Sequence, residues 1–180
     1  MTELHFDVPL PPRPADLEER TAALTAALAE RILVLDGATG TALQGVELSA
    51  DDFGGPDLEG CNENLCATRP DVVDGVHESY LAAGCDVVET NSFGGTPLVL
   101  AEYGLADRAF ELNAAAARLA RAACARHDLS DPSGRRHFVC GSMVADTATG
   151  SRQPACAPAR SMPISPALML RVSWAVSSSR

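Results

Sequence analysis

The chain has 180 residues, which suits one ordinary domain and is too short for two large ones. A formal net charge of −10 argues against nucleic acid as a partner, while a hydrophobic content of 46% is enough for a packed core. All 14 basic residues are arginines, which excludes Schiff-base chemistry, attachment of pyridoxal phosphate and a phosphate-binding lysine.

The N-terminal sequence gives no targeting signal. Residues 1–14 are acidic and contain several prolines, without the basic and apolar regions of a secretion signal. No apolar run in the chain approaches the length of a membrane-spanning helix. We therefore expect a cytoplasmic protein with no membrane partner and with reduced thiols. Its six cysteines are Cys61, Cys66, Cys85, Cys124, Cys140 and Cys156.

The stretch RILVLDGATG organises the predicted fold. A helix is expected over residues 16–31, and the apolar run over residues 32–35 predicts a fully buried strand. This strand ends at Asp36, and Gly37 and Gly40 beside it permit sharp turns and a close approach of a ligand to the backbone. The strand should thus deliver one carboxylate and several free N–H groups to one edge.

The next part of the chain predicts a loop, a helix and a strand. Residues 41–67, rich in glycine, are expected to form a long irregular loop, and loops of this length are usually functional. A helix is predicted from an N-cap at Thr68 to a stop at Gly84. A short strand over residues 86–88 then ends in the polar residues 89–91.

A third helix and strand complete the pattern. Apolar residues recur in steps of four and three between Leu105 and Ala123, which predicts a helix, and residues 137–141 predict a strand. Alternating strands and helices imply a parallel sheet, in which functional groups collect at the carboxyl ends of the strands. Those ends carry Asp36, then Glu89, Thr90 and Asn91, and then Ser142.

The composition changes after Met143. Asp146 is the only acidic residue beyond that point, whereas four arginines and four prolines lie there. A disordered extension and a shifted reading frame both explain such a break. The abundance of Ala, Arg, Pro and Ser favours the shifted frame, because these residues dominate translations of GC-rich sequence in the wrong frame.

Three separated motifs resemble the homocysteine S-methyltransferase family: LDGATGTALQG, GCNENLCATRPDVVDGVHESYLAAGCDVVETNSFGG and FVCGSM. They occur in the family's order and are most similar to the N-terminal domain of cobalamin-dependent methionine synthases. The family fold is a (β/α)8 TIM barrel, so the resemblance implies an α/β chain with about three βα units of an incomplete barrel. The implied organisation is a lead-in and helix over residues 1–30, a partial barrel over 31–143 and an atypical tail over 144–180.

The resemblance also implies homocysteine as the substrate. Asp36 would contact its amino group, and the N–H groups of Gly37 and Ala38 would contact its carboxylate. No residue of the chain is expected to be catalytic. The expected substrate-binding residues are Asp36, Gly37, Ala38, Thr39, Glu89, Thr90, Asn91 and Ser142.

Zinc activates the homocysteine thiol in the full-length family, and methionine synthases bind cobalamin and methyltetrahydrofolate on other domains. The family's zinc cysteines, two of them adjacent, have no counterpart in this chain. Cys61 and Cys66 lack the spacing and the nearby histidine of a zinc site, so no metal site is expected. His77 is expected at the surface or with hydrogen-bond partners. Three further cysteines are expected in the core, namely Cys85, Cys124 and Cys140.

These observations leave three functions open: a fragment of a methyltransferase that is inactive alone, a non-catalytic amino-acid-binding module, and an inert remnant. Homocysteine and zinc separate them, because the enzyme needs both and the binding module needs only the amino acid.

Three strands of a barrel also leave a sheet edge unpaired, so self-association through such edges is expected.

Overall fold

The computed structural model describes residues 15–142. The chain divides into two units, residues 1–33 and residues 34–180. The first contains helix α1 (Leu17–Glu30), which confirms the helix expected over residues 16–31, and none of the residues of α1 is buried. The expected lead-in before this helix and the expected tail lie outside the described residues.

The described part of the second unit, residues 34–142, begins with the extended segment around Leu35, and short helical turns, two long helices and two short strands follow. Helix α5 (Pro70–Ala82) precedes strand β1 (Val87–Glu89), and helix α7 (Ala109–Ser130) precedes strand β2 (Phe138–Cys140). The shorter elements are α2 (Thr39–Gln44), α3 (Ala50–Phe53), η1 (Pro56–Leu58), η2 (Asn62–Asn64), α4 (Leu65–Thr68), α6 (Pro97–Leu100), η3 (Ala101–Tyr103) and η4 (Ala106–Arg108).

The sheet is parallel, as the sequence predicts. Val88 of β1 lies opposite Val139 of β2 in a parallel register. On the other edge of β1, Leu35 forms a single parallel bridge with Val87, and the N–H of Asp36 donates to the carbonyl of Val87 at 2.9 Å. The three segments therefore run in one direction, and their carboxyl ends meet at one edge of the sheet.

The prediction of a fully buried strand over residues 32–35 is wrong. Only Leu35 pairs in the manner of a strand, and the exposed fractions of Ile32, Val34 and Leu35 are 81%, 55% and 47%. Among residues 15–142 this segment has a sheet partner on one edge alone, which is β1. Its apolar sequence is typical of a strand covered on both faces, and the described residues cover it incompletely.

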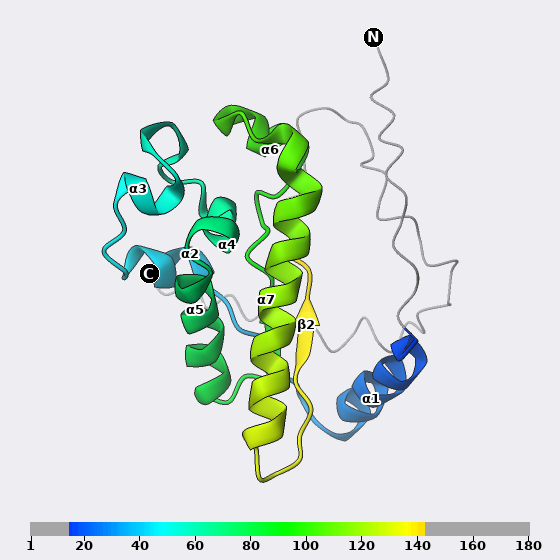
Figure 1. Ribbon diagram of the computed structural model, residues 1–180. Helices are drawn as coiled ribbons and strands as arrows, with labels where there is room; N and C mark the ends of the chain where they lie inside the picture. The colour runs from blue at the N-terminus through cyan, green and yellow to red at the C-terminus, as the bar shows by residue number, and fades with distance from the viewer. Residues whose placement is uncertain (1–14, 143–180) are drawn as a thin grey trace, which may run out of the picture. The chain divides into compact units, whose positions relative to one another are not determined.

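One face of the sheet packs against α5 and α7. Val88 is fully buried in a cluster with Leu81, Ala120 and Ala123. The alanines of α7 permit this close packing because they bring the helix backbone near the sheet. Figure 1 shows α7 beside both α5 and β2.

Residues 41–67 are largely ordered into short helices, contrary to the predicted irregular loop. Thr68 ends α4, where its hydroxyl donates to the carbonyl of Asn64, and Arg69 takes the N-cap position of α5. The predicted stop at Gly84 is confirmed, since Gly84 has a φ of 96°. The N–H groups of Gly84 and Cys85 donate to the carbonyls of Leu81 and Tyr80, which is the Schellman arrangement.

The side chains of His77 and Cys140 differ from the prediction in their burial. His77 of α5 is fully buried, and neither ring nitrogen has a hydrogen-bond partner among the described residues. Burial therefore lowers the pKa of His77. Cys85 and Cys124 are buried as predicted, whereas Cys140 is exposed, because it follows the alternation of β2 onto the face opposite the helices.

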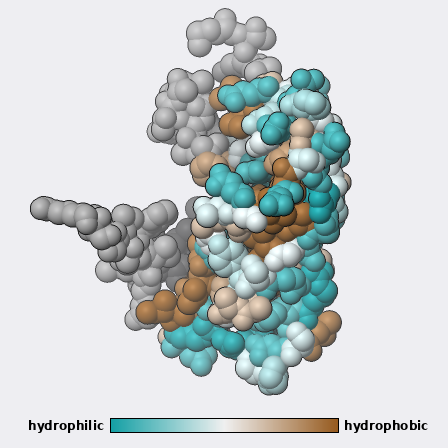
Figure 2. Space-filling view, turned by 90° about the vertical axis from the view of Figure 1, so that its left-hand side faces the viewer, coloured by the Kyte–Doolittle hydropathy of each residue, from teal (hydrophilic) through white to brown (hydrophobic). Residues whose placement is uncertain are grey.

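The second unit exposes several large apolar side chains, and Figure 2 shows hydrophobic residues in brown among the hydrophilic ones of one face. The exposed large apolar residues between residues 34 and 142 are Val34, Leu35, Val46, Phe93, Leu98, Phe110 and Leu129. Within residues 15–142, no helix combines the length and the apolar character needed to cross a membrane.

Replacement of glycine by alanine should have opposite effects on the free energy of unfolding at Gly84 and at Gly75. Gly84→Ala should lower the free energy of unfolding by about 1–2 kcal/mol, because an L-residue adopts a φ of 96° at a cost. Gly75→Ala, inside α5 with open space at the Cβ position, should raise it by about 0.5–1 kcal/mol. Urea denaturation measures both values, and equal effects of the two substitutions would contradict the assignment of Gly84 as the helix stop.

Candidate functional site

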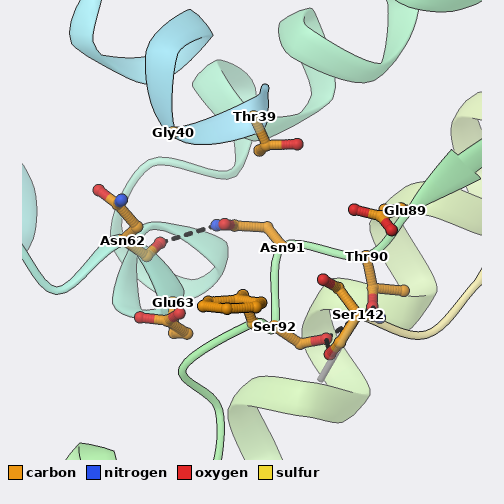
Figure 3. Close-up of a pocket in the computed structure, with 10 residues that line it drawn as sticks. Thr39, Gly40, Asn62, Glu63, Glu89, Thr90, Asn91, Ser92 and Ser142 are labelled. Atoms are coloured by element: carbon orange, nitrogen blue, oxygen red, sulfur yellow. Dashed lines mark hydrogen bonds between the residues drawn. The ribbon is translucent and has the colours of Figure 1, made fainter. Parts of the chain in front are cut away.

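A cavity of about 230 Å³ lies at the carboxyl ends of the parallel segments (Figure 3). Its wall is formed by the start of α2, by η2, by the end of β1 with the segment that follows it, and by Ser142. Polar side chains predominate in this wall. The lining residues are Thr39, Gly40, Asn62, Glu63, Glu89, Thr90, Asn91, Ser92, Phe93 and Ser142.

The structure brings five of the eight expected site residues to this cavity: Thr39, Glu89, Thr90, Asn91 and Ser142. Asp36, Gly37 and Ala38 lie outside its wall, although they immediately precede Thr39.

Four lining residues were not predicted from the sequence. Ser92 and Phe93 could have been found because they directly continue the polar end of β1. Asn62 and Glu63 lie in the long segment that was expected to be functional, although nothing in the sequence singled them out. Gly40, the remaining lining residue, was expected to permit the close approach of a ligand but was not among the expected binding residues.

Hydroxyl groups join the ends of β1 and β2. The N–H of Ser142 donates to Oγ1 of Thr90 at 3.0 Å, and Oγ of Ser92 donates to the carbonyl of Ser142 at 2.9 Å. Since the proton of Ser92 is used in this way, the hydroxyl of Thr90 donates to Oγ of Ser92 at 2.6 Å. The hydroxyl protons of Thr90 and Ser92 are therefore both committed to partners within the protein.

The side-chain amide of Asn91 has a fixed orientation. Its Nδ2 lies 2.7 Å from the carbonyl oxygen of Asn62 and 3.5 Å from Sγ of Cys66. A backbone carbonyl only accepts hydrogen bonds, so the amide nitrogen must face Asn62 and the amide oxygen must face away. Asn91 is only 7% exposed, and its Oδ1 accepts no hydrogen bond from residues 15–142. This oxygen is available to a ligand in the cavity.

Glu63 connects η2 to the segment after β1. Its Oε1 accepts a hydrogen bond from the N–H of Gly94 at 2.7 Å. A Cβ atom on residue 94 would lie 2.8 Å from the same oxygen, which is too close for a normal contact. A side chain at position 94 would therefore displace the Glu63 carboxylate from this position. The second carboxylate oxygen of Glu63 makes no hydrogen bond within the described residues.

Asp36 links the first parallel segment to β1. Its Oδ1 accepts a hydrogen bond from the N–H of Glu89 at 2.7 Å, while its Oδ2 is enclosed without a partner among the described residues. Burial is the main cause that raises the pKa of Asp36 from 3.8 to about 6, and the hydrogen bond from Glu89 acts in the opposite direction. Asp36 therefore supports the position of Glu89.

The turn after Asp36 is held by an alanine in the left-handed region. Ala38 has a φ of 51°, whereas Gly37 and Gly40 do not have positive φ angles, so the expected use of these glycines for sharp geometry is wrong. A non-glycine residue in this region carries strain of about 1 kcal/mol or more. The N–H groups of Gly37 and Ala38 donate to no acceptor among residues 15–142.

The described cysteines do not form a metal site. Within residues 15–142, no three or more His, Cys, Asp or Glu side chains are grouped so that they could hold a metal ion. Burial raises the pKa of Cys66 to about 11 and that of Cys124 to about 12, so both stay protonated at neutral pH. Zinc binds the thiolate form of cysteine, which this environment disfavours.

The chain is similar to known methyltransferases. The family model described as homocysteine S-methyltransferase matches residues 33–164. The methionine synthases of Mycobacterium tuberculosis (strain ATCC 25618 / H37Rv) and Mycobacterium leprae (strain TN) are 46% and 47% identical over 116 residues. Each of these matches covers 64% of this chain and 9% of the relative.

A solved structure is similar as well. The metallated form of the homocysteine methyltransferase MmuM from Escherichia coli has a TM-score of 0.57 and 28% sequence identity to this chain. The match covers 67% of this chain and 41% of MmuM. The chain thus spans about a tenth of the length of the two methionine synthases and about two fifths of MmuM.

The environment of Asp36 predicts a pH-dependent effect of Asp36→Asn. Because folding raises the pKa of Asp36 from 3.8 to about 6, its contribution to stability is present below pH 4 and is lost as the pH rises through 6. The difference between the two pKa values corresponds to roughly 3 kcal/mol. Asn keeps an oxygen for the N–H of Glu89 and does not titrate.

Urea denaturation from pH 4 to pH 7 tests this effect. The free energy of unfolding of the unmodified chain should fall relative to that of Asp36→Asn by up to about 3 kcal/mol over this range. Asp57→Asn, at an exposed position, serves as the control and should show no such trend. A constant difference between the unmodified chain and Asp36→Asn would contradict the burial of an ionisable Asp36.

Proposed function

Since the chain belongs to the homocysteine S-methyltransferase family, we propose that it forms the part of such an enzyme that binds the amino-acid end of homocysteine. The complete enzyme of this kind transfers a methyl group to the homocysteine thiol, a step of methionine biosynthesis. The observation that carries the proposal is the cavity, whose wall unites residues of the three family motifs at the carboxyl ends of parallel segments.

The binding residues that we propose are those expected from the family resemblance. Five line the cavity, and the free N–H groups of Gly37 and Ala38 support a role in receiving a carboxylate at its edge. Asp36 joins this set through its bond to the N–H of Glu89. Holding both ends of an amino acid in this way fixes the direction in which its side-chain sulfur points.

Zinc does not fit the described residues. Zinc in the complete enzyme lowers the pKa of the substrate thiol, but residues 15–142 contain no suitable group of ligands. We therefore assign no reaction step to this chain and propose that it transfers no methyl group alone. Cobalamin and methyltetrahydrofolate would belong to other domains of a methionine synthase.

We extend the proposal to the organisation of the chain. Residues 31–143 supply about three βα units of a (β/α)8 barrel, which the parallel order of the three segments supports. We propose that the barrel part ends near residue 143, although the family match continues to residue 164. Sequencing of the coding region around codon 143 decides between a true tail and a shifted reading frame.

We also propose that the protein is located in the cytoplasm.

Calorimetric titration with homocysteine, with and without zinc, tests the binding role. We expect saturable binding of homocysteine without zinc, no zinc retained after dialysis, and no methionine formed with any methyl donor. Retained stoichiometric zinc together with methionine formation would overturn the proposal in favour of a complete enzyme. A lack of saturable homocysteine binding would identify the chain as an inert remnant.

We also propose that the chain self-associates through its sheet. Val34 and Leu35 are exposed although their sequence is typical of a buried strand, and such a segment offers backbone and apolar groups to another chain. Sedimentation velocity should show oligomers that grow with concentration, and Val34→Lys should shift the distribution towards the monomer. Leu129→Lys, at an exposed apolar site on α7, is the control. A monomer at all concentrations would contradict this prediction.

A further inference from the structure

His77 is a fully buried histidine whose imidazole has no hydrogen-bond partner within residues 15–142. Its exposed fraction is 0%, and neither Nδ1 nor Nε2 is hydrogen bonded to a described residue. Buried polar groups are hydrogen bonded in the great majority of native structures, because an unpaired one loses its bonds to water without replacement. His77 lines no part of the cavity, so ligand binding there does not explain it.

The surroundings of His77 along α5 are apolar. Residues four positions apart lie on one face of a helix, which places His77 between Val73 and Leu81. Val73 belongs to an apolar cluster that includes Ala116 of α7, and Leu81 belongs to another that includes Ala120 of α7. Figure 1 shows α5 and α7 side by side. The imidazole is thus enclosed on the face of α5 that packs against α7.

The charged groups closest to His77 lie at the surface of the two helices. Asp74 and Glu78 of α5 favour a proton on the imidazole, but both carboxylates form ion pairs with Arg126 of α7, at 2.6 and 2.7 Å. The side chains of these acids are also 32% and 39% exposed, so water screens their effect. Burial outweighs them and lowers the pKa of His77.

The other elements in contact with α5 bring no charge to its buried face. Helix α2 has no ionisable residue, and β1 contributes Glu89, whose side chain lines the cavity. Helices α4 and α7 contribute the buried thiols of Cys66 and Cys124, whose pKa values of about 11 and about 12 keep them neutral. The remaining ionisable residues of α7 are exposed or lie near its C-terminal end, namely Glu111, Arg118, Arg121, His127 and Asp128.

We propose that His77 is a pH switch in the fold, because the packing of α5 against α7 holds only while its imidazole is neutral. A proton on the ring carries a charge into an apolar site with no partner to stabilise it, so uptake of the proton releases α5. The cavity responds because α5 contacts α2, whose start lines the cavity, and leads through the turn at Gly84 into β1. This role of His77 goes beyond the proposed function.

The imidazole sets the direction of the effect. The pKa of histidine is about 6.5 in the unfolded chain, and that of His77 is lower in the folded chain. Above this pH neither state holds the proton, whereas below it the unfolded state takes up a proton that the folded state excludes. Stability is therefore lost as the pH falls towards the folded pKa, by up to about tenfold in the folding equilibrium constant per pH unit.

Urea denaturation of the unmodified chain, His77→Gln and His77→Leu at pH 7.5 and pH 5.5 tests the switch. Neither replacement side chain titrates, and both are close in size to histidine. The folding equilibrium constant of the unmodified chain, divided by that of each variant, should fall at least about threefold between the two pH values. This ratio cancels the opposite contribution of Asp36, which all three proteins share. A smaller fall or a rise with either variant would overturn the proposal.

His127→Gln provides the matched control, because His127 lies on α7 and is partly exposed. Replacement of His77 in the His127→Gln protein should still produce the threefold fall. Its disappearance in this background would assign the effect to His127 and overturn the proposal.

NMR of the histidine Cε1–H signals tests the switch in the unmodified chain, even if both variants fail to fold. The His77 signal of the folded state should show no titration midpoint above pH 6. A midpoint above pH 6 would mean that the folded state accepts the proton, and the proposal would then be wrong. Neither measurement uses a ligand, so both results are independent of the proposed function.

Discussion

Strand β1 is hydrogen bonded on both of its edges, and both neighbours run parallel to it. This constraint decides where every polar end of the sheet must lie. Antiparallel neighbours would send Asp36 and Ser142 to the far edge from Glu89, whereas parallel ones bring all three ends together. The bond from the N–H of Glu89 to Asp36 and the bond from the N–H of Ser142 to Thr90 then fasten these ends to one another.

The cavity depends on a second constraint, the close approach of η2 to the segment after β1. Two contacts of similar length maintain it, one from Asn91 to the carbonyl of Asn62 and one from Gly94 to Glu63. The absence of a side chain at Gly94 permits the second contact, and Gly95 is similarly close to Asn113 of α7. The paired glycines therefore serve packing between segments.

The features predicted correctly from sequence are those fixed by local chemistry. The glycine stop at Gly84, the long amphipathic α7 and the polar end of β1 each depend on residues close together in the chain. The family motifs supplied the rest of the prediction, including the five expected residues that line the cavity. Burial of residues 32–35 was not predictable in this way, since it depends on what covers the segment and not on its own apolar pattern.

The role of Glu63 illustrates a different limit. Glu63 and Gly94 lie 31 residues apart, and their contact exists only because the fold brings η2 against the end of β1. The enclosure of Oδ2 of Asp36 likewise follows from packing, so a carboxylate at the end of a strand could be predicted but not its accessibility. Short helices in residues 41–67 are stabilised by tertiary contacts, such as the bond from Asn64 to the carbonyl of Phe53.

An NMR titration of the ¹⁵N-labelled chain with homocysteine decides whether these joined segments form an amino-acid site. We expect saturable shifts that are concentrated in the backbone amides of Gly40, Glu63, Ser92 and Gly94 and in the side-chain amide of Asn91. The signals from the outer surfaces of α5 and α7 should stay unchanged. Saturable shifts confined to those outer surfaces, with the cavity signals unmoved, would show that homocysteine does not bind at the joined segments.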